Sequence, residues 1–192
     1  LKPKTLIAYG FGRLDTLLDE KQKFRQITKD SDLVIITPSY GENNLLNICG
    51  IELIDILLKT KFKVLLRPHF RIFRDSVELI KTIKKRFGEN PNFILEEGVI
   101  PPEKFHNSVS LISDWSGISL EYAFVFERSV IFIDVAKKIL NPNAADILLE
   151  PIEISIRNKI GNVVSPDKLE EIPEIIKKSN QDNERKEQIK KI

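Results

Sequence analysis

The chain has 192 residues, of which 42% are hydrophobic and 30% are charged, as is typical of a globular domain. Its 30 basic and 28 acidic side chains leave a formal net charge of +2, which excludes the one-sided basic character of a nucleic-acid-binding protein. The single cysteine, Cys49, excludes an internal disulfide and a cysteine-built zinc site, and we expect it to be a small buried apolar residue.

The termini and the apolar runs give further expectations about the chain. No apolar run reaches membrane-spanning length and no stretch resembles a signal peptide, which predicts a cytoplasmic protein. The sequence begins with leucine and contains no methionine, which indicates an excised piece of a longer protein. Short motifs therefore carry more information than long intervals.

In chain order, short runs rich in Val, Ile and Phe predict β-strands, and longer amphipathic stretches predict helices. Strands are expected at 5–10, 32–39, 62–69, 92–98, 110–114, 129–134 and 161–165. Helices are expected at 44–60, 74–87, 102–107, 116–126 and 167–180. The strands are continuously apolar, as in sheets covered on both faces, and strand–helix alternation favours a parallel arrangement. The sequence therefore predicts a Rossmann-like α/β fold, a parallel sheet with helices on both faces.

The ends of the chain are interpreted separately from this domain, which spans residues 32–180. Residues 1–31 are interpreted as a linker, because "GFG" lacks the third glycine of a dinucleotide-binding loop and a turn into the domain explains it better. Segment 135–160 is less regular and is expected to wrap the ligand-binding edge. The charged tail, 181–192, predicts an exposed helix, with contact to a membrane surface as the alternative.

Polar motifs follow four of the expected strands: "TPSYGENN", "RPHF", "EEG" and "DWSG". Parallel sheets bind ligands beyond the carboxyl ends of their strands. We therefore expect these motifs to project hydrogen-bond donors and charges toward one edge of the sheet.

The "DWSG" motif lies where a strand changes into a helix, with Asp114, Ser116, Gly117 and Ser119 clustered there. A helix start offers unpaired N–H groups and the positive end of the helix dipole, which together bind anions. Gly117 would let a ligand approach the backbone, and the two serine hydroxyls would add donors. Capping of the helix by Asp114 or Ser116 is an equally good explanation. Glu121, further along the helix, could accept from ribose hydroxyls or be a surface charge.

The "LLRPHF" motif brings Arg67 and His69 to the end of another strand. Arginine offers a planar fork for phosphate, and histidine donates a hydrogen bond or transfers a proton near neutral pH. A lone histidine is more often structural, but the position of His69 at the ligand edge favours a functional role. Arg71 and Arg74 extend the positive charge or are solvated, and His106 is interpreted as structural.

The "TPSYG" loop could present donors from Thr37, Ser39 and Gly41 across a cleft, with a plain turn as the alternative. No His, Cys or carboxylate pair has metal-ligand spacing, and the sequence has neither a nucleophile elbow nor a Walker loop. We therefore expect no metal.

Taken together, "LLRPHF", "LISDWSGISLEYAFVFERSVIFID", "KILNPNAADI" and "PIEISIRNKIGNVVSP" resemble the C-terminal half of the CDP-glycerol glycerophosphotransferase family, over residues 33–180. That family builds teichoic-acid-like polymers and related bacterial surface glycans. The resemblance implies a GT-B architecture, in which two Rossmann-like domains enclose the active site. The C-terminal domain of the pair binds the nucleotide-diphosphate donor.

The resemblance also implies a reaction and a set of site residues. Glycerol phosphate, or a related polyol phosphate, would move from a CDP donor to a hydroxyl of a polyol-phosphate or glycan acceptor, lipid-linked or free. The enzyme would work without a cofactor, at the inner face of the cytoplasmic membrane. The implied catalytic residue is His69, at the donor diphosphate. The implied donor-binding residues are Arg67, Asp114, Ser116, Gly117, Ser119, Glu121, Ser39 and Gly41.

Departures from the family pattern leave alternatives open. The N-terminal domain, with the acceptor surface and a second functional histidine, is absent from this sequence, so we expect the chain alone to bind donor weakly and to catalyse little. Gly117 and Trp115 stand where the family often has serine and tyrosine, which leaves the polyol undefined. A nucleotide-sugar glycosyltransferase or epimerase of the GT-B type would prefer uridine to cytidine. A catalytically silent interaction domain would need none of the grouped site residues.

Overall fold

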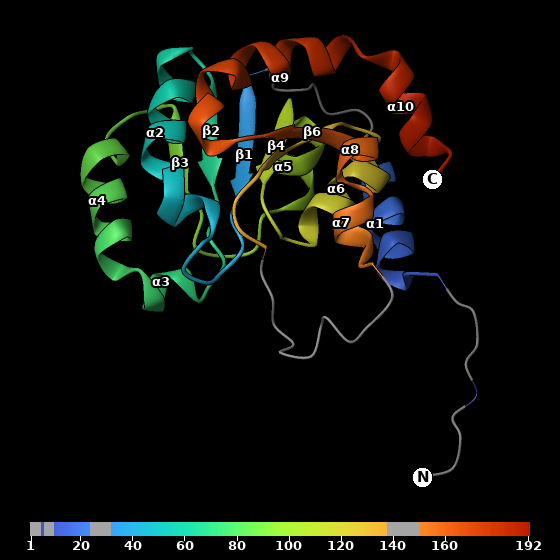
Figure 1. Cartoon of the computed structure of the whole chain (residues 1–192), viewed down its shortest axis with the longest axis horizontal. Helices are drawn as coiled ribbons and strands as arrows, with labels where there is room; N and C mark the ends of the chain where they lie inside the picture. The colour runs from blue at the N-terminus through green and yellow to red at the C-terminus, as the bar shows by residue number, and fades with distance from the viewer. Residues whose placement is uncertain (1–4, 6–9, 24–31, 138–149) are drawn as a thin grey trace.

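The computed structural model describes residues 5, 10–23, 32–137 and 150–192, and these contain a six-stranded parallel sheet (Figure 1). The strand order is β3-β2-β1-β4-β5-β6, with all neighbours parallel. The strands are β1 (Leu33–Thr37), β2 (Lys63–Leu66), β3 (Phe93–Leu95), β4 (Ser110–Ser113), β5 (Val130–Ile133) and β6 (Gly161–Val164). This confirms the predicted Rossmann-like sheet. The expected strand at 5–10 falls largely, and the "KILNPNAADI" motif entirely, outside the described residues.

Helices connect the strands, mostly where the amphipathic pattern placed them. They are α1 (Gly12–Lys23), α2 (Leu45–Lys59), α3 (Ile72–Asp75), α4 (Val77–Phe87), α5 (Pro102–Asn107), α6 (Ile118–Phe126), α7 (Ile152–Ser155), α8 (Arg157–Ile160), the 3-10 helix η2 (Pro166–Glu171), α9 (Ile172–Gln181) and α10 (Asn183–Lys190). The helix expected at 74–87 is divided at Ser76, whose φ of −132° and ψ of 49° are not helical. The helix expected at 167–180 begins with the 3-10 turns of η2.

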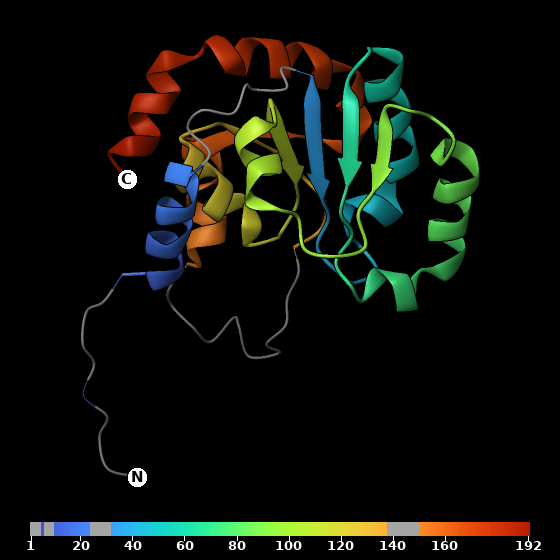
Figure 2. The same ribbon diagram turned by 180° about the vertical axis from the view of Figure 1, so that it is seen from behind.

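Helices cover both faces of the sheet, as predicted (Figures 1 and 2). Alternate residues of β1 pack into different layers, because successive strand side chains point to opposite faces. Val34 and Ile36 belong to a cluster with α2, α4 and α9, whereas Leu33 and Ile35 belong to a cluster with α6, α8 and α10. Every residue of β1 is buried, which explains its continuously apolar sequence.

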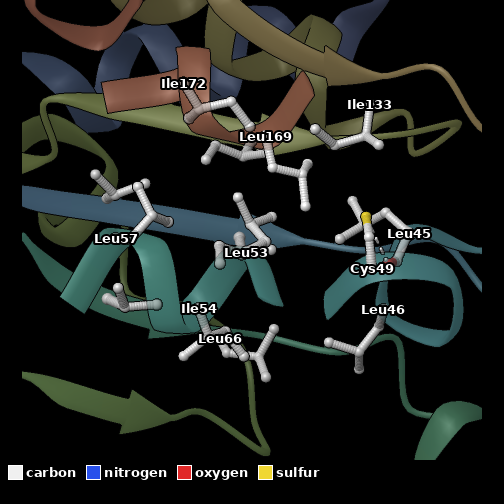
Figure 3. Close-up of a cluster of buried hydrophobic side chains, with 14 of the residues drawn as sticks. Leu45, Leu46, Cys49, Leu53, Ile54, Leu57, Leu66, Ile133, Leu169 and Ile172 are labelled. Atoms are coloured by element: carbon white, nitrogen blue, oxygen red, sulfur yellow. Dashed lines mark hydrogen bonds between the residues drawn. The ribbon is translucent and has the colours of Figure 1, made fainter. Parts of the chain in front are cut away.

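The first of these clusters is built around α2, which lies against the sheet and the segment containing Leu169 and Ile172 (Figure 3). The side chain of Asn44 caps α2 by accepting from the backbone N–H of Leu46 at 2.9 Å. Cys49 is 7% exposed within this cluster, which confirms the expected buried apolar thiol.

Helix α1 lies within residues 1–31, the segment interpreted from sequence as a linker. It packs on α6 and α5. Its stabilising contacts include polar ones: Arg13 Nε lies 2.7 Å from Glu121 Oε1, and Lys21 Nζ donates to the carbonyl of Val125 at 2.6 Å. No α1 residue is fully buried. A helix without a buried face needs few apolar residues, which explains why the sequence of α1 has only a weak apolar periodicity.

Candidate functional site

The predicted polar motifs meet at the carboxyl edge of the sheet. "TPSYG" follows β1, "RPHF" follows β2 and "DWSG" follows β4, and β1 pairs directly with both β2 and β4. The strand order changes direction between β1 and β4, which is the switch point where such sheets bind ligands. Three of the four predicted motifs are therefore adjacent at the expected place.

The carboxylate of Asp114 forms the centre of this edge and is 1% exposed. Its Oδ1 accepts from the backbone N–H of Ser39 at 2.8 Å and of Trp115 at 2.6 Å, and its Oδ2 accepts from Leu45 at 2.9 Å. Since Leu45 is the first residue of α2, the negative charge also lies at the positive end of that helix dipole. Asp114 thus joins the loop after β1, the "DWSG" turn and the start of α2.

The start of α6 is formed by the remaining "DWSG" residues. The carbonyl of Ser116 accepts from the backbone N–H of Ser119 at 3.1 Å and from its hydroxyl at 2.7 Å, which uses the single hydroxyl proton of Ser119. Gly117 is the N-cap, is exposed, and makes no side-chain capping bond. A Cβ on Gly117 would meet nothing within 4 Å. Neither Asp114 nor Ser116 caps α6 through its side chain, so the positive end of α6 opens onto accessible backbone.

His69 lies half-buried in the turn after β2. Its Nδ1 accepts from the backbone N–H of Arg71 at 3.2 Å, which places the proton of the neutral ring on Nε2. The ring lies 4.6 Å from that of Tyr40 and 4.4 Å from that of Phe70, measured between centroids. Arg71 places its guanidinium carbon 4.5 Å from the Tyr40 ring centroid. Tyr40 was not among the predicted site residues, although it lies in the "TPSYG" motif.

Two further predicted residues, Arg67 and Glu121, line one cavity of about 460 Å³. The cavity is bounded by α1, by the turn between β3 and α5, and by α6. Arg67 Nε donates to the carbonyl of Gly98 at 3.3 Å, and Glu121 accepts from Arg13 on α1. The volume lies within the range of small-molecule sites.

The other residues of the "TPSYG" loop have structural contacts. Ser39 uses its backbone N–H to bind Asp114. Gly41 has a φ of +109°, a conformation that favours glycine, and its carbonyl accepts from the side-chain amides of Asn44 and Asn47. Thr37 is buried, and its carbonyl accepts from the hydroxyl of Ser113 at 2.8 Å. The loop is therefore held from several sides.

A buried arginine, Arg157, lies behind the "DWSG" turn and was also missed. Its guanidinium carbon is 4.0 Å from the Trp115 ring centroid and 5.0 Å from that of Phe132. Its Nη1 lies 3.2 Å from Asp134 Oδ1, and its Nη2 donates to the carbonyl of Ile133 at 3.2 Å. Burial lowers the pKa of Arg157, and the nearby Asp134 opposes that shift. The guanidinium thus packs against the Trp115 ring and restricts its position.

Two negative findings apply to the residues that the structure describes. Among them, no three His, Cys, Asp or Glu side chains are grouped to hold a metal ion. Within the same residues, no helix combines the length and the apolar character needed to span a bilayer.

Comparisons with known proteins identify the fold. No family model and no curated protein matches the chain. Among solved structures, the wall teichoic acid polymerase TagF is 18% identical with a TM-score of 0.55, and the match covers 95% of this chain and 46% of that one. The UDP-GlcNAc 2-epimerase of Methanocaldococcus jannaschii is 13% identical with a TM-score of 0.57 over 93% of this chain and 50% of the other. The Neisseria meningitidis epimerase is 16% identical with a TM-score of 0.52 over 93% and 45%.

These similarities show that the chain has a Rossmann-like fold of the GT-B type. The chain spans half or less of the length of these structures. The chain is therefore similar to no more than one half of each of these structures.

Proposed function

We propose that this chain is the donor-binding domain of a transferase that moves glycerol phosphate, or a related polyol phosphate, from a CDP donor to an acceptor hydroxyl. The observation that carries the proposal is the geometry of α6. Its uncapped start at Gly117 offers backbone N–H groups to a phosphate, and Glu121 on the same helix lines a cavity of nucleoside-compatible size.

The spacing along α6 suits a nucleoside diphosphate. Glu121 lies three residues after Ile118, or about 4.5 Å along the axis, since a helix rises 1.5 Å per residue. The base would occupy the cavity, the ribose hydroxyls would donate to Glu121, and the diphosphate would lie at Gly117. Arg67, which lines the same cavity, supplies a positive charge.

The chemistry requires an acceptor oxygen in line with the phosphorus that carries the polyol, and stabilisation of charge on the departing cytidine nucleotide. His69, protonated on Nε2, is the donor we assign to the departing phosphate. The start of α6 and Arg67 add electrostatic stabilisation. The three hydrogen bonds that Asp114 accepts from the backbone give it an indirect role: it positions the turn and the loop that surround the phosphate.

The proposal includes a second domain and a place of action. A companion N-terminal domain would bind the acceptor, and transfer would take place at the inner face of the cytoplasmic membrane. TagF, whose structures include crystals soaked with CDPG, matches this chain along less than half of its length.

A second candidate is a nucleotide-sugar glycosyltransferase or epimerase domain. It is favoured by the similarity to UDP-GlcNAc 2-epimerases, one of which was solved with UDP-GlcNAc and UDP. The two candidates differ in the base of the nucleotide, cytosine in the first and uracil in the second.

The test is a calorimetric titration of the chain with CDP-glycerol, CDP, CMP and UDP up to millimolar concentration, repeated on Gly117→Ala. Alanine fits the backbone at this position, where φ is −59° and ψ is −22°, and its Cβ meets open space. We expect the variant to fold as the parent does and to bind CDP at least about tenfold more weakly, because the methyl group obstructs a phosphate at the helix start.

Each outcome bears on one part of the proposal. Equal CDP binding by parent and variant would place the phosphate elsewhere. A preference for UDP would favour the second candidate. Failure of every nucleotide to bind would overturn the donor-binding function.

A further inference from the structure

One wall of the cavity is formed by α1, which packs beside α6 (Figures 1 and 2). The residues of α1 that line the cavity are Arg13, Thr16, Leu17 and Glu20. Their spacing of three, one and three positions is that of a single helix face. Helix α1 therefore turns two opposite charges, at the two ends of this face, toward the cavity.

The facing wall is apolar and partly aromatic, with Phe105 from α5 and Ile118, Tyr122 and Phe126 from α6. Flat apolar surfaces of this kind accommodate planar rings. The other charged residues of the lining, Arg67 and Glu121, are assigned above to the phosphate and the ribose, so the polar edge of a planar base in this cavity would be recognised from the α1 side.

Arg13 is held at the cavity by Glu121. The hydrogen bond at 2.7 Å uses Nε, and this bond, followed by the charge of Glu121 and then by that of Glu20, raises the pKa of Arg13. Among the described residues, the terminal amino groups of Arg13 make no other side-chain bond, and 58% of its side chain is exposed. The two terminal amino groups can therefore donate to a ligand while Nε keeps its bond to Glu121.

Cytosine and uracil would present different hydrogen-bonding edges to Arg13 and Glu20. Cytosine has two neighbouring acceptors, O2 and N3, and an amino group on C4 that donates. Uracil instead has a donor at N3 and an acceptor at C4. An arginine fork that meets O2 and N3, with a carboxylate further along the same helix face that meets the amino group, matches the cytosine edge, whereas uracil would bring donor against donor and acceptor against acceptor.

We propose that Arg13 and Glu20 read the base of the bound nucleotide and select cytosine over uracil. This inference rests on the proposed nucleotide-binding function and assigns its base specificity to α1. Arg13 donates to O2 and N3 of the base, and Glu20 accepts from the amino group. The bond between Arg13 and Glu121 then also connects recognition of the base to the carboxylate assigned to the ribose.

The test compares the ratio of UDP to CDP dissociation constants, measured by calorimetry, in the parent chain and three variants. Glu20→Gln removes the negative charge and presents an amide that pairs with either base, so we expect the ratio to fall about tenfold. Arg13→Lys keeps the positive charge and removes the planar fork, and should weaken the binding of CDP more than that of UDP. Asp19→Asn makes a matched charge change at an exposed position of α1 that does not line the cavity, and should leave the ratio unchanged.

Three results would overturn the inference. If both nucleotides bind and the ratio is the same in the parent, Glu20→Gln and Arg13→Lys, base selection lies elsewhere while the donor-binding function stands. If Arg13→Lys weakens CDP and UDP equally, Arg13 only fastens α1 to α6. If the parent binds neither nucleotide, the donor-binding function fails together with this inference. Unfolding curves for each variant show whether α1 remains in place.

Discussion

The carboxylate of Asp114 accepts the backbone N–H of Ser39 at 2.8 Å and so joins the ends of two adjacent strands, β4 and β1. With its bonds to Leu45 and Trp115, the same side chain fixes the switch point of the sheet. The helix start of α6 is thereby kept clear of a capping side chain, because the nearest carboxylate is already engaged with α2 and the loop after β1. A buried carboxylate thus leaves the start of α6 accessible.

We predict that Asp114→Ala lowers the free energy of unfolding by about 3 kcal/mol, because hydrogen bonds to a charged group are lost and buried N–H groups remain without acceptors. Asp114→Asn should cost less, since the amide oxygen still accepts at one position. Urea denaturation measures both values, and Asp19→Ala on the surface of α1 is the control. A loss below about 1 kcal/mol for Asp114→Ala would show that water replaces these bonds.

The sheet was predictable because each strand carries its own signal. The five buried residues of β1 give a continuous apolar run, and "DWSG" marks the end of β4 by its change in composition. The meeting of the polar motifs at one edge of the sheet then followed from the parallel topology. The bonding partners of Asp114 did not follow, because Ser39 and Leu45 lie 75 and 69 positions away in sequence. Local pattern left a cap on α6, by Asp114 or Ser116, and an anion site equally open, and the tertiary structure places the Asp114 carboxylate at α2.

Other features were not predictable for a related reason. Helix α1 is secured by Arg13 and Glu121, which are 108 positions apart, and its own apolar pattern is weak. Arg157 resembles a surface charge in sequence, because its contacts with the rings of Trp115 and Phe132 depend on residues of other elements. In both cases a polar side chain gains its role from distant partners, and single-sequence patterns do not contain that information.

The thiol of Cys49 should make stability depend on alkaline pH. Burial, followed by the charges of Glu52 and Asp114, raises its pKa from 9.0 to about 12. Between these values the unfolded chain has released the proton and the folded chain retains it, so the free energy of unfolding falls as pH rises. Between pH 8 and pH 10, the titration of Cys49 should lower the free energy of unfolding by about 1.4 kcal/mol.

The measurement for Cys49 is urea denaturation at the two pH values under reducing conditions, for the parent chain and Cys49→Ala. The pH dependence of the variant measures the titration of all other groups. The free energy of unfolding of the parent should therefore fall by about 1.4 kcal/mol more than that of the variant. An equal loss in both proteins would show that the thiol ionises in the folded chain as it does in the unfolded one.

Gly161 should not tolerate a side chain. It is the first residue of β6 and pairs with Val130, and an added Cβ would lie 2.2 Å from the Val130 carbonyl oxygen and 2.8 Å from the Phe132 ring. We expect Gly161→Ala to lower the free energy of unfolding by about 2 kcal/mol or more, because the backbone of β5 must move. Gly117→Ala, whose methyl group meets open space, should change stability by less than about 0.5 kcal/mol. Equal stability of the two variants in thermal denaturation would contradict the close approach of β6 to β5.

The last prediction concerns the guanidinium of Arg157, whose side chain is 6% exposed. Lysine cannot stack flat against Trp115, since its compact ammonium group lacks the planar guanidinium. We therefore expect Arg157→Lys to lower the free energy of unfolding by about 2 kcal/mol. Trp115 is the only tryptophan of the chain, so the emission spectrum reports on its surroundings alone. Emission should shift to longer wavelength as water reaches the indole ring.

Asp134→Asn separates the ion pair from the stacking. The Asp134 side chain is 57% exposed, so loss of its charge should cost less than about 1 kcal/mol and leave Trp115 emission unchanged. If both variants shift the emission equally, the ion pair and not the stack orients Trp115. If Arg157→Lys changes neither stability nor emission, the guanidinium does not fix the "DWSG" turn, and the bonds of Asp114 and the bond from Trp115 Nε1 to the Val135 carbonyl hold it instead.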